Sequence, residues 1–250
     1  MAQLFAGTSG FAFPAWKPDF YPEGLPQKRF LEHYAGRLNA VEINYTFRRM
    51  PSAATVSGWV AATPPGFRFA PKAHQQITHF RKLRDVEQPT RFFLERLEPL
   101  GAAGRLGPVL FQLPPYLRCD VELLRDFLAL LPPEVRAAFE FRHESWLSDA
   151  VYRLLAERNI SLCVAESDEF TVPEVITADF VYFRLRRSDY TPDEVAGMRA
   201  RARELVAAGK DVLVFFKHEE TPEGALNAEQ LLAPDPRALT PPLSAGPAAR

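Results

Sequence analysis

Eight short apolar segments recur along the chain, and most of them turn polar only where they end. The segment at 137–142, for example, is apolar up to Phe139 and then carries Glu140 and Arg142 at alternate positions. Alternate residues of a strand project from the same face of a sheet, so this pair is costly to bury unless the face borders a pocket. Parallel strands that become polar at their carboxyl ends are typical of a barrel with its active site there. The segments are residues 4–7, 40–44, 68–72, 108–113, 137–142, 161–165, 180–185 and 211–216.

Helical patterns separate these segments, at residues 27–36, 53–62, 89–101, 121–131, 149–158 and 191–208. The last begins with Thr191-Pro192-Asp193-Glu194, a helix-start signature, and Gly209 marks its end. Alternation of strands with helices predicts an α/β protein with a single TIM-type (β/α)8 barrel or a distorted variant of it, and an open doubly wound sheet is the alternative. No GxGxxG or GxxxxGK[ST] motif supports that alternative. The stretch between Lys72 and Pro89 reads as a long loop.

Composition limits the remaining possibilities. With 250 residues and 47% hydrophobic content, the chain matches one barrel at residues 1–233, followed by a Pro/Ala-rich tail at 234–250 that we expect to be disordered. A net charge of −1 argues against bulk electrostatic binding to nucleic acid or membranes. No apolar stretch is long enough to span a bilayer and the first residues lack a basic leader region, so we expect a cytoplasmic protein. Cys119 and Cys163 show no disulfide or zinc spacing.

Several motifs in order along the chain resemble the YecE-like family, also called domain of unknown function 72. They are Gly7-Thr8-Ser9-Gly10 with Trp16, Val41-Glu42-Ile43-Asn44 with Phe47, Lys72-Ala73 with Ile77-Thr78-His79, the run 107–115, Glu140-Phe141-Arg142-His143 with Ser145-Trp146, and the run 178–182. The resemblance implies a TIM-barrel fold and brings no established activity. Many members have Arg-Leu-His-Gly and Phe-Asn-Asn where this chain has Arg184-Leu185-Arg186-Arg187 and Phe216-Lys217-His218, and both differences add positive charge.

Strand alternation predicts where the polar residues meet. Residues of one segment that are two apart share a face, and in a barrel these faces turn inward, so the polar side chains converge at the mouth. The pairs are Glu42 with Asn44, Glu140 with Arg142, and Arg184 with Arg186. Positive charge predominates, since Glu42, Glu140 and Glu166 are outnumbered by Lys72, Arg142, Arg184, Arg186 and Lys217. Because arginine forks suit phosphate and carboxylate groups, we expect a small anionic ligand or a nucleic-acid fragment as the partner.

Roles follow from chemistry. We expect Glu42 or Glu140 to act as a general base, with Lys72 stabilising charge and His74 as a further catalytic group that moves protons. The residues expected to bind substrate are Thr8, Ser9, Asn44, Gln112, Arg142, His143, Arg184, Arg186, Lys217 and Trp146. Trp146 could form an aromatic rim with Trp16, Phe47 and Tyr116, although a tryptophan after a strand is as often loop packing.

Three functions remain open at this stage. The first is an enzyme acting on a phosphate-bearing substrate, such as a phosphoester or nucleic-acid hydrolase; the second is a sugar or sugar-phosphate isomerase; the third is a non-catalytic binder of an anionic metabolite or nucleic acid. A divalent metal is conceivable because His74, His143 and His218 accompany the carboxylates. The nearby cations and the lack of HxH or HExxH spacing disfavour it, so we expect no cofactor. A structural alternative is a self-neutralising ring of charges that fills the barrel top.

Overall fold

The computed structural model describes residues 1–168, 170–187, 189–217 and 220–234. Its eight strands are all parallel, and six of them form one sheet in the order β1-β8-β7-β6-β5-β4, while β2 and β3 form a separate pair. The strands are β1 (Leu4–Thr8), β2 (Ala40–Ile43), β3 (Arg68–Pro71), β4 (Val109–Gln112), β5 (Ala137–Glu140), β6 (Ser161–Glu166), β7 (Phe180–Leu185) and β8 (Asp211–Phe216). The predicted tail lies outside the described residues from position 235 onward.

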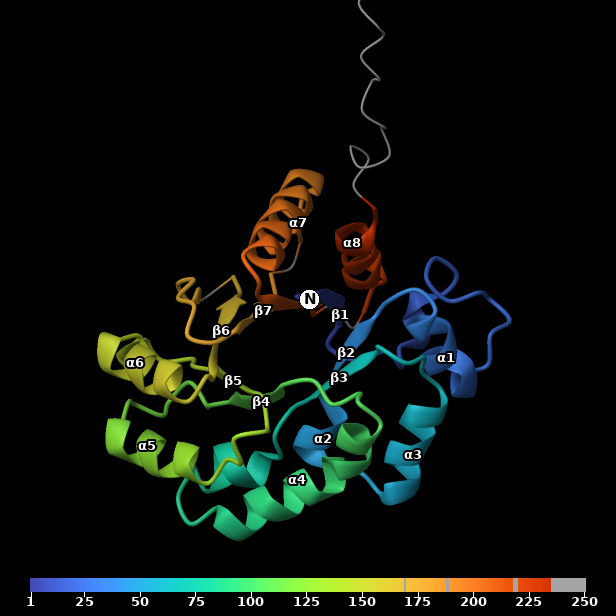
Figure 1. The fold of residues 1–250 in the computed structure, drawn as a ribbon. Coiled ribbons are helices and arrows are strands. Elements are labelled where there is room, and N and C mark those ends of the chain that lie inside the picture. Colours follow the sequence, from blue (N-terminus) through green and yellow to red (C-terminus); the bar gives the residue numbers. More distant parts are fainter. Residues whose placement is uncertain (169, 188, 218–219, 235–250) are drawn as a thin grey trace, which may run out of the picture.

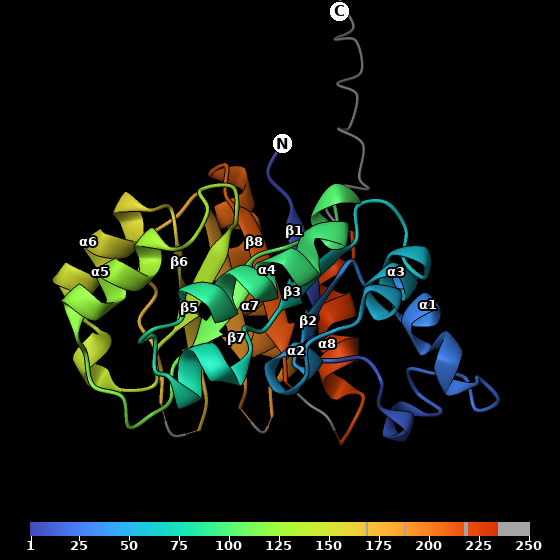
Figure 2. The same ribbon diagram turned by 90° about the horizontal axis from the view of Figure 1, so that it is seen from below.

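Helices surround the strands, which are arranged in a ring when viewed along the barrel (Figure 1) and run side by side in the perpendicular view (Figure 2). The helices are α1 (Phe30–Ala35), α2 (Tyr45–Arg48), α3 (Ala53–Ala61), α4 (Glu87–Ala102), α5 (Val121–Ala129), α6 (Asp149–Glu157), α7 (Pro192–Ala207) and α8 (Glu223–Leu232). The predicted α/β barrel is therefore confirmed in its distorted form. In the described residues, no helix is long and apolar enough to cross a bilayer.

Local sequence accounts for most helix boundaries. At α7 the Thr191 side chain and Glu194 form a reciprocal capping box with Pro192 in the first turn, and Gly209 follows the helix with a φ of +83°. The predicted loop after β3 is wrong in part, because it contains a π-helical turn at Gln76–Phe80. Helices α2 and α8 were not predicted. The α8 helix packs on β1, β8 and α7, and tertiary contact of this kind stabilises short helices that have weak periodicity.

Two seams join the strand pair β2–β3 to the larger sheet. At the β1–β2 seam, side chains replace much of the missing ladder: Asn39 accepts from Ala6 N (2.8 Å) and donates to Leu4 O (2.9 Å). The Tyr34 hydroxyl accepts from Thr8 N (2.8 Å) and donates to Ala40 O (2.9 Å). At the β3–β4 seam, backbone hydrogen bonds run from Gly107 N to Phe69 O (2.7 Å) and from Ala73 N to Leu110 O (2.9 Å). The barrel is thus closed by few bonds at each seam.

Each seam also contains a glycine at a point of close backbone approach. A Cβ atom on Gly7 would lie 1.9 Å from Ala40 O, and one on Gly107 would lie 2.9 Å from Phe69 O. Both distances are too short for a side chain, so the seams require glycine at these two positions.

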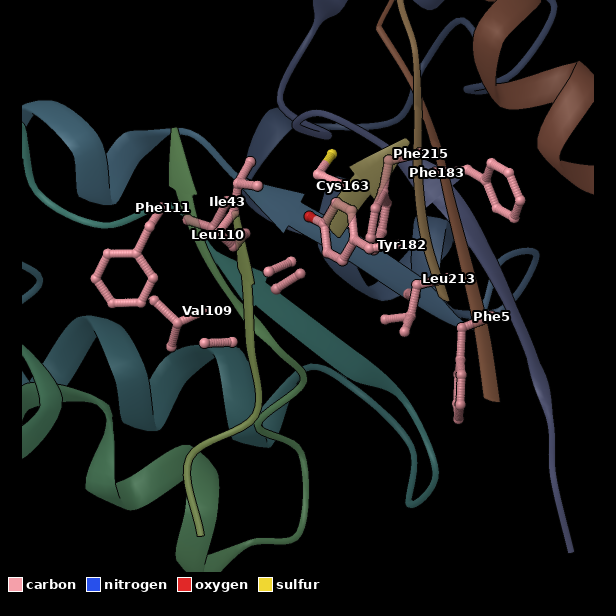
Figure 3. Close-up of a cluster of buried hydrophobic side chains, with 14 of the residues drawn as sticks. Phe5, Ile43, Val109, Leu110, Phe111, Cys163, Tyr182, Phe183, Leu213 and Phe215 are labelled. Carbon is pink, nitrogen blue, oxygen red and sulfur yellow. The ribbon is translucent and has the colours of Figure 1, made fainter. Parts of the chain in front are cut away.

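Apolar side chains fill the barrel below its mouth. Tyr182 and Phe215 lie beside each other there, with ring centroids 5.2 Å apart, whereas Phe111 points away from them and packs on Phe127 of α5 (Figure 3). On β7, Tyr182 and the residues two apart from it face the interior, whereas on β4, Phe111 and the residues two apart from it face the helices. This alternation carries the next inward residue of β7, Arg184, to the mouth.

The Tyr34 hydroxyl offers a direct test of seam closure. We expect Tyr34→Phe to lower the free energy of unfolding, because it leaves the buried Thr8 N–H and Ala40 carbonyl without this partner, and one unsatisfied buried group costs about 1–3 kcal/mol. Urea denaturation followed by circular dichroism would measure the change. Tyr116→Phe is the matched control, since Tyr116 is exposed and its loss should change stability by less than about 0.5 kcal/mol. Equal effects of the two substitutions would contradict the role of Tyr34.

Candidate functional site

A buried arginine connects two glutamates at the carboxyl ends of the strands. Arg184 of β7 donates to Glu42 of β2 through Nε (2.9 Å to Oε2) and Nη2 (2.8 Å to Oε1), and to Glu140 of β5 through Nη1 (2.7 Å to Oε2). All three side chains are buried. The expected convergence of these residues is therefore found, because strand alternation directs each of them inward at the same level of the barrel.

Neutral side chains satisfy the remaining lone pairs of Glu42. Ser9, which follows β1, donates to Oε1 (2.7 Å), and Tyr182 donates to Oε2 (2.8 Å). Both oxygens of Glu42 thus accept hydrogen bonds from two sides. A carboxylate with this number of donors is well suited to hold its neighbours in place.

Gln112 of β4 links Glu140 to Lys72. Its Nε2 donates to Glu140 Oε1 (2.7 Å), and its Oε1 accepts from Lys72 Nζ (2.7 Å). The orientation of the amide is set by chemistry, because an ionised carboxylate can only accept and so requires the NH2 group of Gln112. Lys72, which follows β3, also lies over the Phe47 ring, with Nζ 4.2 Å from the centroid.

Further cations lie outward from this network. Arg142 donates through Nε to Glu140 Oε1 (3.0 Å), and Arg186 Nη1 is 3.6 Å from the same oxygen. Arg187 points the other way and pairs with Glu194 at 2.5 Å, as strand alternation predicts. Lys217 follows β8 and lines the same mouth as Arg186. The mouth therefore carries more positive than negative side chains.

The barrel mouth contains a cavity of about 870 Å³, lined by Arg184 and most of the cations just described. Two kinds of side chain form its walls, and no carboxylate belongs to the described residues that line it. The aromatic residues are Phe11, Phe13, Tyr45, Phe47 and Trp59, and the cationic residues are Arg48, Lys72, Arg142, Arg184, Arg186 and Lys217. Ser9, Asn44 and Gln112 also line it. Its size is typical of a site for a small molecule.

Six residues expected at the site do not line this cavity: Glu42 and Glu140, which lie buried behind Arg184, and four others. Thr8 faces α1 and its hydroxyl donates to Gly10 O (2.6 Å), while His74 Nδ1 accepts from Gln76 N (3.3 Å). His143 Nδ1 accepts from Ser145 N (3.1 Å) and so caps a short helical turn. Trp146 is fully buried, donates to Leu117 O (2.7 Å) and stacks on the Phe141 ring. Each of the four thus has a local contact outside this cavity.

Of the other aromatic residues considered from the sequence, only Phe47 reaches the cavity. Trp16 is fully buried in the core and Tyr116 is exposed at the surface. Sequence reasoning missed the wall residues Phe11, Phe13, Tyr45, Arg48 and Trp59, which lie on loops or on α2 and α3 and carry no strand parity to follow. Tyr182 was also missed, although it is two residues before Arg184 on the same strand, so strand alternation predicts that both side chains point inward.

Electrostatics distinguish the titratable groups of the network. Burial, helped by the nearby charge of Arg184, lowers the pKa of Lys72 to about 8. Burial favours a raised pKa for Glu140, but the charges of Arg184, Arg142 and Lys72 prevail and lower it. Burial also lowers the pKa of His79 to about 4, with contributions from Lys72 and Arg142. At neutral pH, Glu140 is thus ionised, His79 is neutral, and Lys72 is the group closest to its titration midpoint.

The side chains that commonly hold metal ions are not gathered at this site. Within residues 1–168, 170–187, 189–217 and 220–234, no group of three or more His, Cys, Asp or Glu side chains is placed to hold a metal ion. His218 lies outside the described residues.

The sequence matches one protein family over nearly its whole length. The model of the family described as "Protein of unknown function DUF72" matches residues 5–243. UPF0759 protein YunF of Bacillus subtilis is 26% identical over 254 residues, which cover 85% of this chain and 88% of that protein. UPF0759 protein YecE of Escherichia coli K12 is 32% identical over 143 residues, which cover 55% of this chain and 52% of that protein.

Solved structures agree with the fold. A DUF72 family protein of Thermotoga maritima superposes with a TM-score of 0.82 at 28% identity and covers 92% of this chain and 98% of its own. A DUF72 family protein of Enterococcus faecalis has a TM-score of 0.73 at 21% identity and covers 93% and 98%, respectively. The second likeness supports the fold alone.

The buried position of Glu42 leads to a stability prediction. We expect Glu42→Gln to lower the free energy of unfolding by about 3–5 kcal/mol, because it leaves Arg184 without part of its charge partner in a buried setting. Urea denaturation at pH 7 would measure it. Glu95→Gln is the control: its partner Arg91 is 3.9 Å away and both side chains are more than half exposed, so a loss of about 0–1 kcal/mol is expected. A similar small loss for Glu42→Gln would show that the charge network is not a structural requirement.

Lys72 leads to a pH prediction. Its acylation by an amine-reactive anhydride should rise with a midpoint near pH 8, whereas an ordinary lysine titrates near about 10.4. Because the pKa is lower in the folded chain, the unfolded chain binds more protons between about pH 8 and 10.5, and the contribution of Lys72 to stability increases with pH over this range. Peptide mass spectrometry would follow Lys72 and Lys28 in the same sample. Identical profiles for the two lysines would contradict the assignment.

Proposed function

The chain belongs to the DUF72 family, whose description assigns no activity. We propose that it is an enzyme that binds a small phosphate-bearing substrate at the carboxyl-terminal mouth of its barrel. The proposal concerns the cavity lined by the strand ends and by the aromatic residues of the neighbouring loops and helices. Its basis is the hydrogen-bonding state of the cations there.

The observation that carries the proposal is the state of Arg186. Its Nε is buried and has no hydrogen-bond partner among the described residues, and the Arg186 side chain is 19% exposed. A buried donor without an acceptor is costly, and where it lines a cavity it supports a ligand that supplies the acceptor. Arg187 Nε and Arg199 Nε also lack an acceptor among the described residues, but neither residue lines this cavity. The guanidinium fork matches the oxygens of a phosphate group, which accept strong charge-assisted hydrogen bonds.

Two other cations of the cavity can also bind an anion. Arg48 and Lys217 form no ion pair within the described part of the chain, although both line the cavity. Arg142 shares Glu140 with Arg184, Arg186 and Gln112, so its charge is only partly balanced. The excess of positive charge supports an anionic ligand over a neutral sugar.

The same geometry bears on the reaction. We expected Glu42 or Glu140 as the general base, but both oxygens of each carboxylate already accept hydrogen bonds. We therefore propose that these glutamates hold Arg184 and Gln112 in place, and that Lys72 is the group that reacts with substrate. This assignment favours proton transfer or carbonyl chemistry on a phosphate-bearing molecule over hydrolysis that relies on a carboxylate base.

Calorimetric titration with inorganic phosphate tests the anion site. We expect Arg186→Ala to weaken phosphate binding tenfold or more, as the loss of a charge-assisted hydrogen bond is worth about 1.5–3 kcal/mol. Lys217→Ala should weaken binding less, because its contact at the open mouth is screened by solvent, and the affinity of the unmodified protein should fall as salt is added.

Arg187→Ala provides the matched control for this experiment. Arg187 is the same residue type at the next position, but it points away from the cavity and pairs with Glu194. Its loss should leave phosphate affinity unchanged. No binding of phosphate at low salt, or equal weakening by Arg186→Ala and Arg187→Ala, would contradict the proposed anion site.

A further inference from the structure

Lys72 differs from the other cations of the mouth in its surroundings. It is 8% exposed, lines the cavity and, within the described residues, forms no ion pair. Among the described residues, its Nζ donates to the side-chain oxygen of Gln112 and lies over the Phe47 ring. A charged Lys72 gains a cation–π contact with Phe47, but it loses hydration on burial and lies near the charge of Arg184. A residue needed only as a fixed positive charge in such a place is more readily an arginine, which is always charged.

From this geometry we infer that Lys72 is an amine nucleophile that forms a Schiff base with the carbonyl group of an anionic aldehyde or ketone bound in the cavity. This inference rests on the proposed anion site and names its substrate class. The anionic group of the substrate would bind Arg186 and Lys217, and its carbonyl carbon would meet Nζ at the base of the cavity.

Gln112 orients the amine of Lys72 for attack on a carbonyl group. Because its NH2 group is held by Glu140, its carbonyl oxygen faces Nζ and accepts one N–H, which orients the nitrogen without neutralising a charge. A glutamate at this position would stabilise the ammonium form and suppress nucleophilicity. The lowered pKa of Lys72 is consistent with this arrangement, since a substantial fraction of neutral amine is then present near pH 8.

The chemical step balances without an added oxidant or reductant. Neutral Nζ attacks the carbonyl carbon, so an N–C bond forms as the C=O π bond opens, and one amine hydrogen moves as a proton to the carbonyl oxygen to give a carbinolamine. The C–O bond then breaks, and the hydroxyl leaves with the second amine hydrogen as water while the C=N bond forms. The proton that the ammonium released returns to the imine nitrogen, and the resulting cation withdraws electrons from the adjacent carbon.

The aromatic walls refine the choice of probe. Phe11, Phe13, Tyr45, Phe47 and Trp59 supply flat apolar surface opposite the cations. A planar ring that carries both an aldehyde and a phosphate can therefore contact both kinds of wall. Pyridoxal 5′-phosphate has these groups and serves here as a chemical probe, and pyridoxal is its matched partner without the phosphate.

The test is borohydride trapping of the full-length protein, followed by peptide mass spectrometry. We expect one saturable label per chain, on Lys72, with at least tenfold more labelling by pyridoxal 5′-phosphate than by pyridoxal at equal concentration. Lys72→Arg keeps the charge and should abolish this label, while Lys28→Arg, outside the cavity, should not. Circular dichroism would confirm that the variants fold, and the peptide map of the unmodified protein identifies the labelled residue without any variant.

The outcomes separate the two proposals. Phosphate binding by calorimetry with no label on Lys72, or with label on Lys217 instead, overturns the Schiff base and leaves the anion site intact. A label on Lys72 that is equally strong with pyridoxal and pyridoxal 5′-phosphate overturns the anionic substrate class. Loss of both phosphate binding and Lys72 labelling overturns both.

Discussion

The buried contact of Arg184 with two glutamates is the interaction on which the mouth of this barrel depends. Glu42 comes from β2, Glu140 from β5 and Arg184 from β7, so one guanidinium joins strands that are not neighbours in either sheet. Removing charges from water costs several kcal/mol for each ion, and the cost is repaid only where geometry and hydrogen bonding are good. Here the neutral donors Ser9, Tyr182 and Gln112 complete the shells of both carboxylates.

This contact matters more because, at two places in the barrel, few backbone hydrogen bonds join neighbouring strands. The strands β2 and β3 are joined to the larger sheet by side chains of Tyr34 and Asn39 on one side and by a few backbone bonds on the other. Arg184 reaches across the interior to Glu42 of β2, and the Ser9 hydroxyl reaches Glu42 from the end of β1. The charge network is thus both a support for the cavity and a connection between the two parts of the barrel.

The network also divides the charged residues into two groups. Arg184 is buried between carboxylates, and its position is fixed. Arg186 and Lys217 lie farther out and retain hydrogen-bond donors for a ligand. Lys72 belongs to neither group, because it is buried like Arg184 but donates to the neutral amide of Gln112. A ring that existed only to neutralise itself would not leave Arg48, Lys72 and Lys217, which line the cavity, without an ion pair among the described residues. We therefore favour a ligand site over the purely structural ring.

The sequence by itself determined the eight strands, six of the helices and the inward direction of Glu42, Glu140, Arg142, Arg184 and Arg186. These features follow from local patterning: short apolar runs form buried parallel strands, and a period of two fixes the face of every residue on them. Family motifs added independent support for the barrel. The direction of Arg187, away from the cavity, followed from the same period.

Only the tertiary structure decided which polar groups near the strand ends reach the cavity. Thr8, His74, His143 and Trp146 follow strands as the site residues do, yet each finds a nearer structural partner in a loop or helix. The aromatic wall comes from Phe11, Tyr45 and Trp59, whose loops and short helices have no period that sets a direction. The hydrogen bonds that fill both oxygens of Glu42, and the bond from Lys72 to the amide of Gln112, likewise join strands far apart in the sequence. They form only when those strands meet in the folded barrel.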